Sequence, residues 1–237
     1  MGTGIGHYVP LLAYLACWAT IVASLAGRPL WGLYYMLLLL PYRTLRDHFL
    51  DYPLGANVLT ILVLALIVGA LLRGKRLPKS NIYLTWLIFG IYMYMSMWLG
   101  TALGHANAPL WIHDVNLATW KDYMLLPLVF VAAGLVVEDR KTVRMVILIT
   151  GISLLLIDRS ALMDSMSRSW STFDENKRDG GPLGFAGSNG LAAFLAQFSL
   201  FFWGFGQFLK RKKAKLLCYA LTATTIFARH WSYSRAT

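Results

Sequence analysis

Four polar residues in a strongly apolar chain have the types and spacing to bind an anion. Arg178 precedes a glycine-rich stretch, residues 180–192, that contains Ser188 and Asn189, and Arg235 lies near the end of the chain. The stretch would allow a tight turn into a helix, whose first backbone N–H groups and positive dipole end attract anions. Two guanidinium groups can each grip a phosphate with two hydrogen bonds. The pattern therefore indicates a phosphate or pyrophosphate site.

A simpler interpretation uses the same residues. Ser188 or Asn189 could cap an ordinary helix N-terminus, and Arg235 could anchor a helix end at a membrane surface, with its aliphatic stem along apolar groups. On the residues alone this interpretation is slightly favoured. Either way, Asn and Arg cost a few kcal/mol in a bilayer unless they are paired or near the interface. Both interpretations therefore place these side chains at helix ends.

Composition identifies the environment in which these helices lie. Of the 237 residues, 57% are apolar and 14% charged, whereas about a quarter of a soluble domain is charged. The net charge of +11 does not indicate a nucleic-acid partner, because twelve of the 22 Lys and Arg lie in three short linkers between apolar runs. We expect an integral membrane protein whose partners include membrane lipids. Cys17 and Cys218 lie in apolar runs and are expected to be buried and unpaired.

The apolar runs predict an all-α, polytopic transmembrane helix bundle of about eight spans. The whole chain, residues 1–237, is expected to form one transmembrane domain. The second run is short for a full crossing, which takes about 20 residues, so whether it spans is left open. The predicted spans are residues 8–26, 30–40, 54–72, 81–103, 120–137, 142–157, 184–208 and 216–230.

The distribution of charge predicts the sides of the membrane. The basic linkers at residues 73–79, 138–144 and 209–215 follow the third, fifth and seventh spans, and they are assigned to the cytoplasm by the positive-inside rule. The stretch at 158–184, the other loops on that side and the end of the chain would then lie outside. Nine of the eleven acidic residues are on this outer side. This places Asp158 outside the bilayer and no charge in the middle of a span. A small-solute transporter is disfavoured for that reason.

Other groups are weaker candidates. His105, His113 and Asp114 share one loop and could ligate a metal, but solvated polar residues are the better interpretation. Lys121 and Asp122 are expected to form a local pair. We predict no metal and no cofactor.

Several short motifs, in order, resemble the N-terminal half of the O-antigen ligase-like membrane family, in particular its exosortase-associated O-glycosylation ligase branch. The resemblance spans nearly the whole chain, and each motif alone is weak. The motifs are Leu-Leu-Pro-Tyr-Arg at 39–43, Tyr-Pro-Leu at 52–54, Arg-Leu-Pro at 76–78, Trp-Lys-Asp-Tyr at 120–123, Gly-Gly-Pro at 180–182, Gly-Ser-Asn-Gly-Leu-Ala at 187–192 and Ser-Tyr-Ser-Arg-Ala at 232–236.

This resemblance implies transfer of a polyprenyl-diphosphate-linked glycan at the outer face of a bacterial inner membrane. Arg235 and Arg178 would meet the diphosphate, and Asn189, beside Ser188, would shape the pocket. Arginines would then stabilise charge on the lipid diphosphate that leaves, without a metal.

The chain also departs from the family, whose members continue past the Ser-Arg motif into a loop with a histidine expected to act in catalysis. His230 is not at that position. The chain is therefore expected to be incomplete for catalysis, with its catalytic residues unknown. The alternative is a non-enzymatic, truncated relative that serves as an accessory transmembrane subunit and contacts partner membrane subunits.

Overall fold

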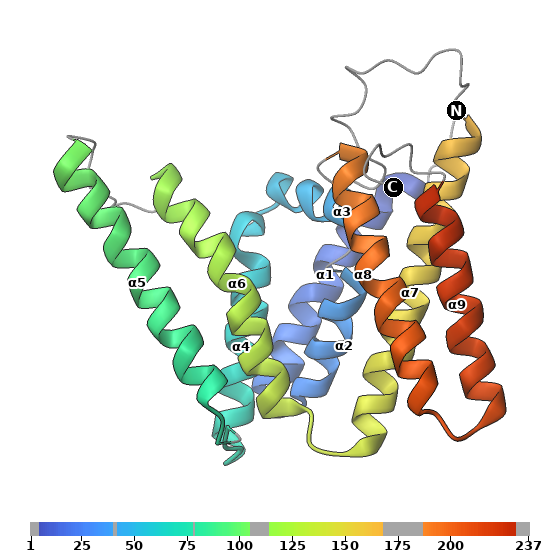
Figure 1. Cartoon of the computed structure of the whole chain (residues 1–237). Coiled ribbons are helices and arrows are strands. Elements are labelled where there is room, and N and C mark those ends of the chain that lie inside the picture. Colours follow the sequence, from blue (N-terminus) through green and yellow to red (C-terminus); the bar gives the residue numbers. More distant parts are fainter. Residues whose placement is uncertain (1–4, 40–41, 78, 105–113, 168–186, 231–237) are drawn as a thin grey trace. The chain divides into compact units, whose positions relative to one another are not determined.

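The structure is a computed structural model that describes residues 5–39, 42–77, 79–104, 114–167 and 187–230 (Figure 1). Within these ranges the chain is all-α, as predicted. The α-helices are α1 (Ile5–Leu25), α2 (Pro29–Leu39), α3 (Arg43–Asp47), α4 (Val58–Leu72), α5 (Asn81–Gly104), α6 (Val115–Val136), α7 (Arg140–Ser167), α8 (Gly187–Phe208) and α9 (Lys212–His230). Two short 3-10 helices, η1 (His48–Asp51) and η2 (Gly55–Asn57), complete the described part.

Six described segments are long and apolar enough to cross a membrane, so the chain is a multi-pass membrane protein. They are Tyr8–Leu25, Gly55–Leu72, Asn81–Gly104, Val115–Val136, Arg140–Met163 and Gly190–Phe208. Each meets the length of about 20 residues that a hydrocarbon core requires. The apolar helix Pro29–Leu39 is shorter.

Contacts between helices divide the chain into two compact units. Unit 1 comprises Met1–Ala13, Met36–Pro53 and Val143–Thr237, and unit 2 comprises Tyr14–Tyr35 and Leu54–Thr142. The expectation that residues 1–237 form one domain stays a prediction.

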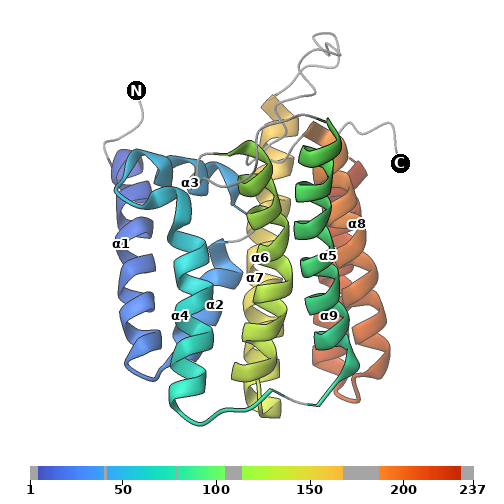
Figure 2. The same cartoon turned by 90° about the vertical axis from the view of Figure 1, so that its left-hand side faces the viewer.

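Unit 2 is held together by close helix approaches. The methyl group of an alanine at Gly69 on α4 would lie 2.1 Å from the backbone carbonyl oxygen of Ser24, so α1 and α4 are in backbone contact there. The helix α6 packs against α4 and against α5 (Figure 2). At the second contact the Trp120 indole donates a hydrogen bond to the Gly90 carbonyl at 3.3 Å. Small residues thus set the helix spacing, as is common in membranes.

Unit 1 is built around a long α7 and the pair α8–α9. Their apolar side chains form one buried cluster, with Leu154 and Ile157 from α7, Leu191 and Leu195 from α8, and Leu221 from α9 at its centre. In Figure 1 and Figure 2, α8 and α9 lie side by side and are joined at their lower ends.

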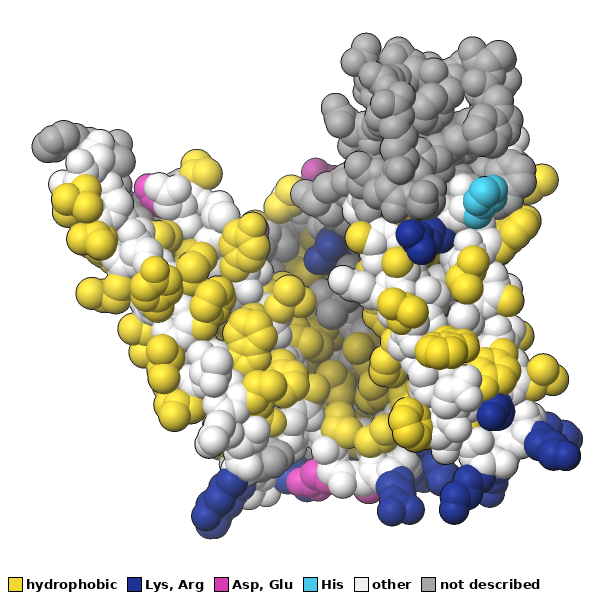
Figure 3. Space-filling model, in the orientation of Figure 1, with side chains coloured by type: hydrophobic (Ala, Val, Ile, Leu, Met, Phe, Trp, Pro, Cys, Tyr) yellow, Lys and Arg dark blue, Asp and Glu magenta, His cyan; other side chains and the backbone are white. Residues whose placement is uncertain are grey.

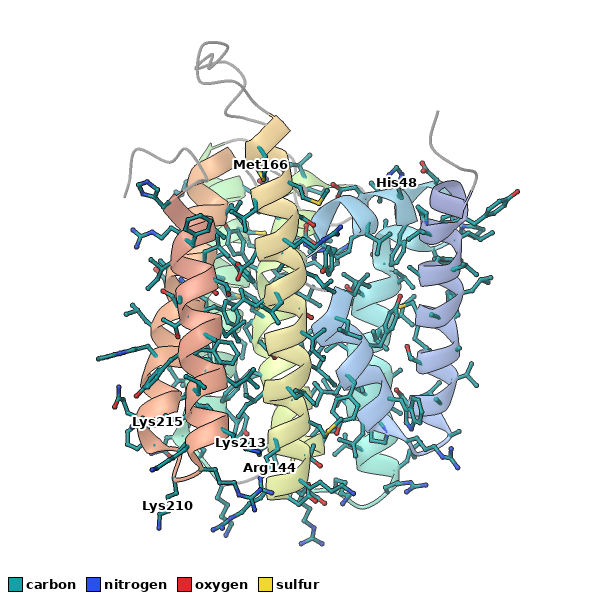
Figure 4. The ribbon with its side chains drawn as sticks, turned by 90° about the vertical axis from the view of Figure 1, so that its right-hand side faces the viewer. His48, Arg144, Met166, Lys210, Lys213 and Lys215 are labelled. Atoms are coloured by element: carbon teal, nitrogen blue, oxygen red, sulfur yellow. The ribbon has the colours of Figure 1, made fainter. Side chains whose placement is uncertain are left out.

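The two ends of unit 1 differ in charge. Arg144, Lys210, Lys213 and Lys215 lie at one end of the helices, whereas His48 and Met166 lie at the other (Figure 4). The basic linker at 209–215 and the start of α7 therefore share one end, as the positive-inside assignment requires.

Some predicted helix bounds were wrong. The fifth span begins at Val115, five residues before the predicted start, because Asp114 caps it: Oδ1 of Asp114 accepts the N–H groups of Asn116 at 2.8 Å and Leu117 at 3.0 Å. The sixth predicted span ended at Ile157, but α7 continues to Ser167. That extension moves Asp158 from the predicted outer loop into the apolar part of a helix.

Candidate functional site

The α8–α9 hairpin determines which helix ends meet. Near its turn, Gly206 lies against α9, where an added methyl group would be 2.9 Å from the Tyr219 ring. Farther along, the Thr222 hydroxyl lies 3.5 Å from the Ser199 carbonyl oxygen. The two helices are therefore antiparallel neighbours along their length. The start of α8 and the end of α9 consequently lie at the same end of unit 1, opposite the lysine-rich turn.

The residues predicted to bind phosphate fall at this end or beyond it. The backbone of Ser188 and Asn189 forms part of the first turn of α8, while their side chains are outside the described part. Arg178 and Arg235 also lie outside the described residues. The same-end arrangement that the predicted site needs is thus present in the backbone, and the contact of its four side chains stays a prediction.

Asp158 occupies a second candidate site, inside the helices of unit 1. It lies within the apolar span Arg140–Met163 of α7 and is only 2% exposed. It is the one buried Asp or Glu among the residues whose side chains the structure describes. Its neighbours along the same face of α7 are Leu154, Ile157 and Ala161, all buried in the apolar cluster. An acidic residue inside a membrane span is costly, so it points to a functional role.

Two threonine hydroxyls of α9 hold one oxygen of this carboxyl. The hydroxyls of Thr224 and Thr225 each lie 3.1 Å from Oδ2 of Asp158. Both hydroxyls also contact the carbonyl oxygen of Leu221, at 2.9 Å and 2.7 Å. The second oxygen, Oδ1, is buried and has no hydrogen-bond partner among the described residues. The site therefore joins α7 to α9 and leaves one acceptor open.

The sequence interpretation missed Asp158 because it ended the helix at the first acidic residue. Helical periodicity carried the signal: residues 154, 157, 158 and 161 are spaced as one face of a helix and are buried together. The apolar Ala161 beyond the aspartate shows that the buried face does not stop at Ile157. A continued helix was therefore readable from the spacing.

Other sequence candidates have structural roles. Asp114 is a helix cap, and His105 and His113 lie outside the described residues. Among the described residues no group of three potential ligands could hold a metal ion. The predicted Lys121–Asp122 pair was wrong, because the Lys121 ammonium donates to Oδ1 of Asn57 at 2.7 Å. Cys17 and Cys218 are buried and free, as predicted.

The chain was compared with protein families, curated proteins and solved structures. No protein family, curated protein or solved structure matches it.

Proposed function

We propose that the chain is part of a membrane enzyme related to the O-antigen ligases and polymerases, which transfers a polyprenyl-diphosphate-linked glycan at the outer face of a bacterial inner membrane. Its place would be in lipopolysaccharide biosynthesis or a similar glycan pathway. The proposal includes a count of about eight spans, in which Pro29–Leu39 and α9 also cross.

One observation carries this proposal. The antiparallel α8–α9 pair brings the Gly-Ser-Asn-Gly start of α8 to the end from which the Ser-Arg motif follows α9. That end is opposite the basic side chains Lys210, Lys213 and Lys215 (Figure 4), and by the positive-inside rule it faces outward. A lipid diphosphate lies at the membrane surface, where this helix start and Arg235 would meet it.

In this proposal Arg235 and Arg178 bind the diphosphate oxygens and stabilise the charge that develops as the glycan leaves. Asn189 and Ser188 line the pocket, and the free N–H groups of the first turn of α8 face the same anion. The residue that activates the acceptor is not assigned.

The test is binding of a polyprenyl diphosphate to the protein in lipid nanodiscs, with the matching polyprenol as the ligand that lacks the anion. Each hydrogen bond to a charged group contributes roughly 1.5–3 kcal/mol, so Arg235→Ala and Arg178→Ala should each weaken binding by about tenfold or more. Lys213→Ala, at the opposite end, should leave binding unchanged. Equal binding of diphosphate and polyprenol, or full binding by both arginine variants, would exclude the site.

The transfer reaction gives a second measurement. In the full-length protein, Arg235→Ala should abolish glycan transfer, whereas normal transfer by this variant would remove Arg235 from the mechanism.

A specific observation favours the alternative, an accessory subunit. Of the whole of α5, only Gly90 is buried, and hydrophobic side chains cover its sides (Figure 3). The exposed ones include Leu84, Leu87, Ile88, Ile91, Met95, Leu99 and Leu103. Partner helices could cover this surface as well as lipid can. A membrane subunit that copurifies in stoichiometric amount and cross-links to α5 would support this function.

A further inference from the structure

Asp158 has surroundings that suit a neutral carboxyl better than a charged one. We propose that Asp158, Thr224 and Thr225 form a proton-binding site within the membrane-spanning helices, with the proton held on the Asp158 carboxyl. This inference does not depend on glycan transfer, and it concerns a different part of unit 1 from the predicted diphosphate site.

Counting hydroxyl protons supports the assignment. The two threonine oxygens make four close contacts, two to Oδ2 of Asp158 and two to the Leu221 carbonyl oxygen, all between 2.7 and 3.1 Å. Each threonine carries one hydroxyl proton, so together they can fill two of the four contacts. A proton on Oδ2 would fill a third by donating to one of the threonines. Protonation therefore turns an oxygen–oxygen contact without a proton into a hydrogen bond.

The open oxygen leads to the same conclusion. Oδ1 is buried and has no hydrogen-bond partner in the described part of the chain. In an ionised carboxylate both oxygens share the negative charge, so an unpaired buried oxygen carries the full cost of desolvation. In a protonated carboxyl Oδ1 is a neutral carbonyl oxygen, for which the cost is much smaller.

No described cation is in ion-pair distance of Asp158. The ion pairs His48–Asp51 and Lys75–Glu138 join other described residues. On α7 the neighbouring Arg159 is exposed.

The other helices that pack on the apolar cluster carry few titratable groups. Described α8 residues include none, α9 carries Cys218 in the cluster and Arg229 and His230 at its end, and Tyr42 packs from the segment before α3. None of these is hydrogen-bonded to the carboxyl in the described structure, where its partners are the two threonines.

Thr224 connects the buried carboxyl to the outside of the α8–α9 pair. Thr225 is buried, but Thr224 lies on the exposed side of α9. Its hydroxyl contacts the buried carboxyl and reaches the surface of the helix pair. On deprotonation the carboxyl O–H bond breaks, the electron pair stays on Asp158, and the proton passes to a water molecule or buffer base that approaches along Thr224.

Infrared difference spectroscopy tests the site directly on the whole protein in nanodiscs. A protonated carboxyl gives a C=O stretching band that an ionised carboxylate lacks, and that band shifts in D₂O. We expect such a band at about pH 7, far above the usual pKa of about 3.9 for Asp, and its loss in Asp158→Asn. Asp139→Asn, at an exposed helix cap, is the matched control and should leave the band unchanged.

Three outcomes would overturn the proposal. One is the absence of any protonated-carboxyl band in the wild-type protein at neutral pH, a measurement that does not require a variant to fold. Another is a band that persists in Asp158→Asn. The third is a carboxylate band that responds to exchange of Na⁺ for choline, which would assign the site to a metal cation instead of a proton.

Discussion

Gly69 on α4 lies where the backbone of α1 comes closest. Because an added methyl group would lie 2.1 Å from the Ser24 carbonyl oxygen, Gly69→Ala must push the two helices apart. Overpacking of this kind costs roughly 1–3 kcal/mol, and the variant should unfold at a lower temperature in detergent. Gly100→Ala on α5 is the control: nothing lies within 4 Å of its added methyl group, and alanine is the better helix former. Equal losses in both variants would contradict this contact.

Asp139 caps α7 outside the membrane. Hydrogen bonds from the side chain and backbone of Thr142 hold the pKa of Asp139 below its usual value of 3.8, and Oδ1 accepts the Thr142 N–H at 2.8 Å. A carboxyl whose pKa is lower in the folded state stabilises the fold above its unfolded pKa. That contribution is lost as the pH falls through the folded pKa.

Asp139→Ala should therefore lower the melting temperature at neutral pH, and its difference from the wild type should shrink below about pH 3.8. Asp47→Ala is the matched control, because Asp47 precedes η1 without a side-chain capping hydrogen bond. Its difference from the wild type should be small. A constant difference for Asp139→Ala across the acid range would show that the cap does not depend on the charge.

The pairing of α8 with α9 carries the proposed function and can be tested as an element. In a background of Cys17→Ala and Cys218→Ala, the pair Gly190→Cys and His230→Cys should be joined by a short bifunctional maleimide. Gly190 has open space around it, and His230 is exposed. Gly190→Cys with Lys213→Cys should not cross-link, because α9 separates the two α9 positions by about 25 Å. Cross-linking of the second pair alone would mean that the helices are parallel.

Most helices were predictable, because long apolar runs can satisfy their backbone in a bilayer only as helices. The α4 and α8 runs were placed within a few residues. Two bounds failed for different reasons. Asp114 caps α6 through contacts that a hydropathy pattern does not contain, whereas the continuation of α7 was readable from the spacing of residues 154, 157, 158 and 161, and only the partners of Asp158 on α9 were not.

The two candidate sites differ in how far the sequence predicts them. Counting spans predicted that Asn189 and Arg235 share one membrane surface. The α8–α9 hairpin places the start of α8 and the end of α9 at one end of unit 1, and Arg235 itself lies outside the described residues. The Asp158 site depends on which helix faces α7. Thr224 and Thr225 lie 66 and 67 residues away in sequence, and no local pattern links them to the aspartate.

At the scale of the whole molecule, charge determines orientation. Basic linkers are retained on the cytoplasmic side because they resist translocation. In unit 2 the Lys75 ammonium pairs with the Glu138 carboxylate, so the linkers after α4 and α6 share one end of that unit. In unit 1 Arg144 and the lysines of the α8–α9 turn share one end (Figure 4). Each unit by itself therefore has a basic end, as a membrane protein inserted with one orientation requires.

Orientation can be measured with single cysteines placed at the two ends of unit 1, again with Cys17 and Cys218 replaced by alanine. Met166 is 84% exposed at the end opposite Lys213. A membrane-impermeant maleimide should label Met166→Cys in right-side-out vesicles and Lys213→Cys only in inside-out vesicles, since the positive-inside rule predicts that the basic turn is cytoplasmic. Labelling of both cysteines from one side would mean that α8 does not cross. The reversed pattern would place the start of α8 in the cytoplasm, where an outer-face glycan donor could not reach Asn189.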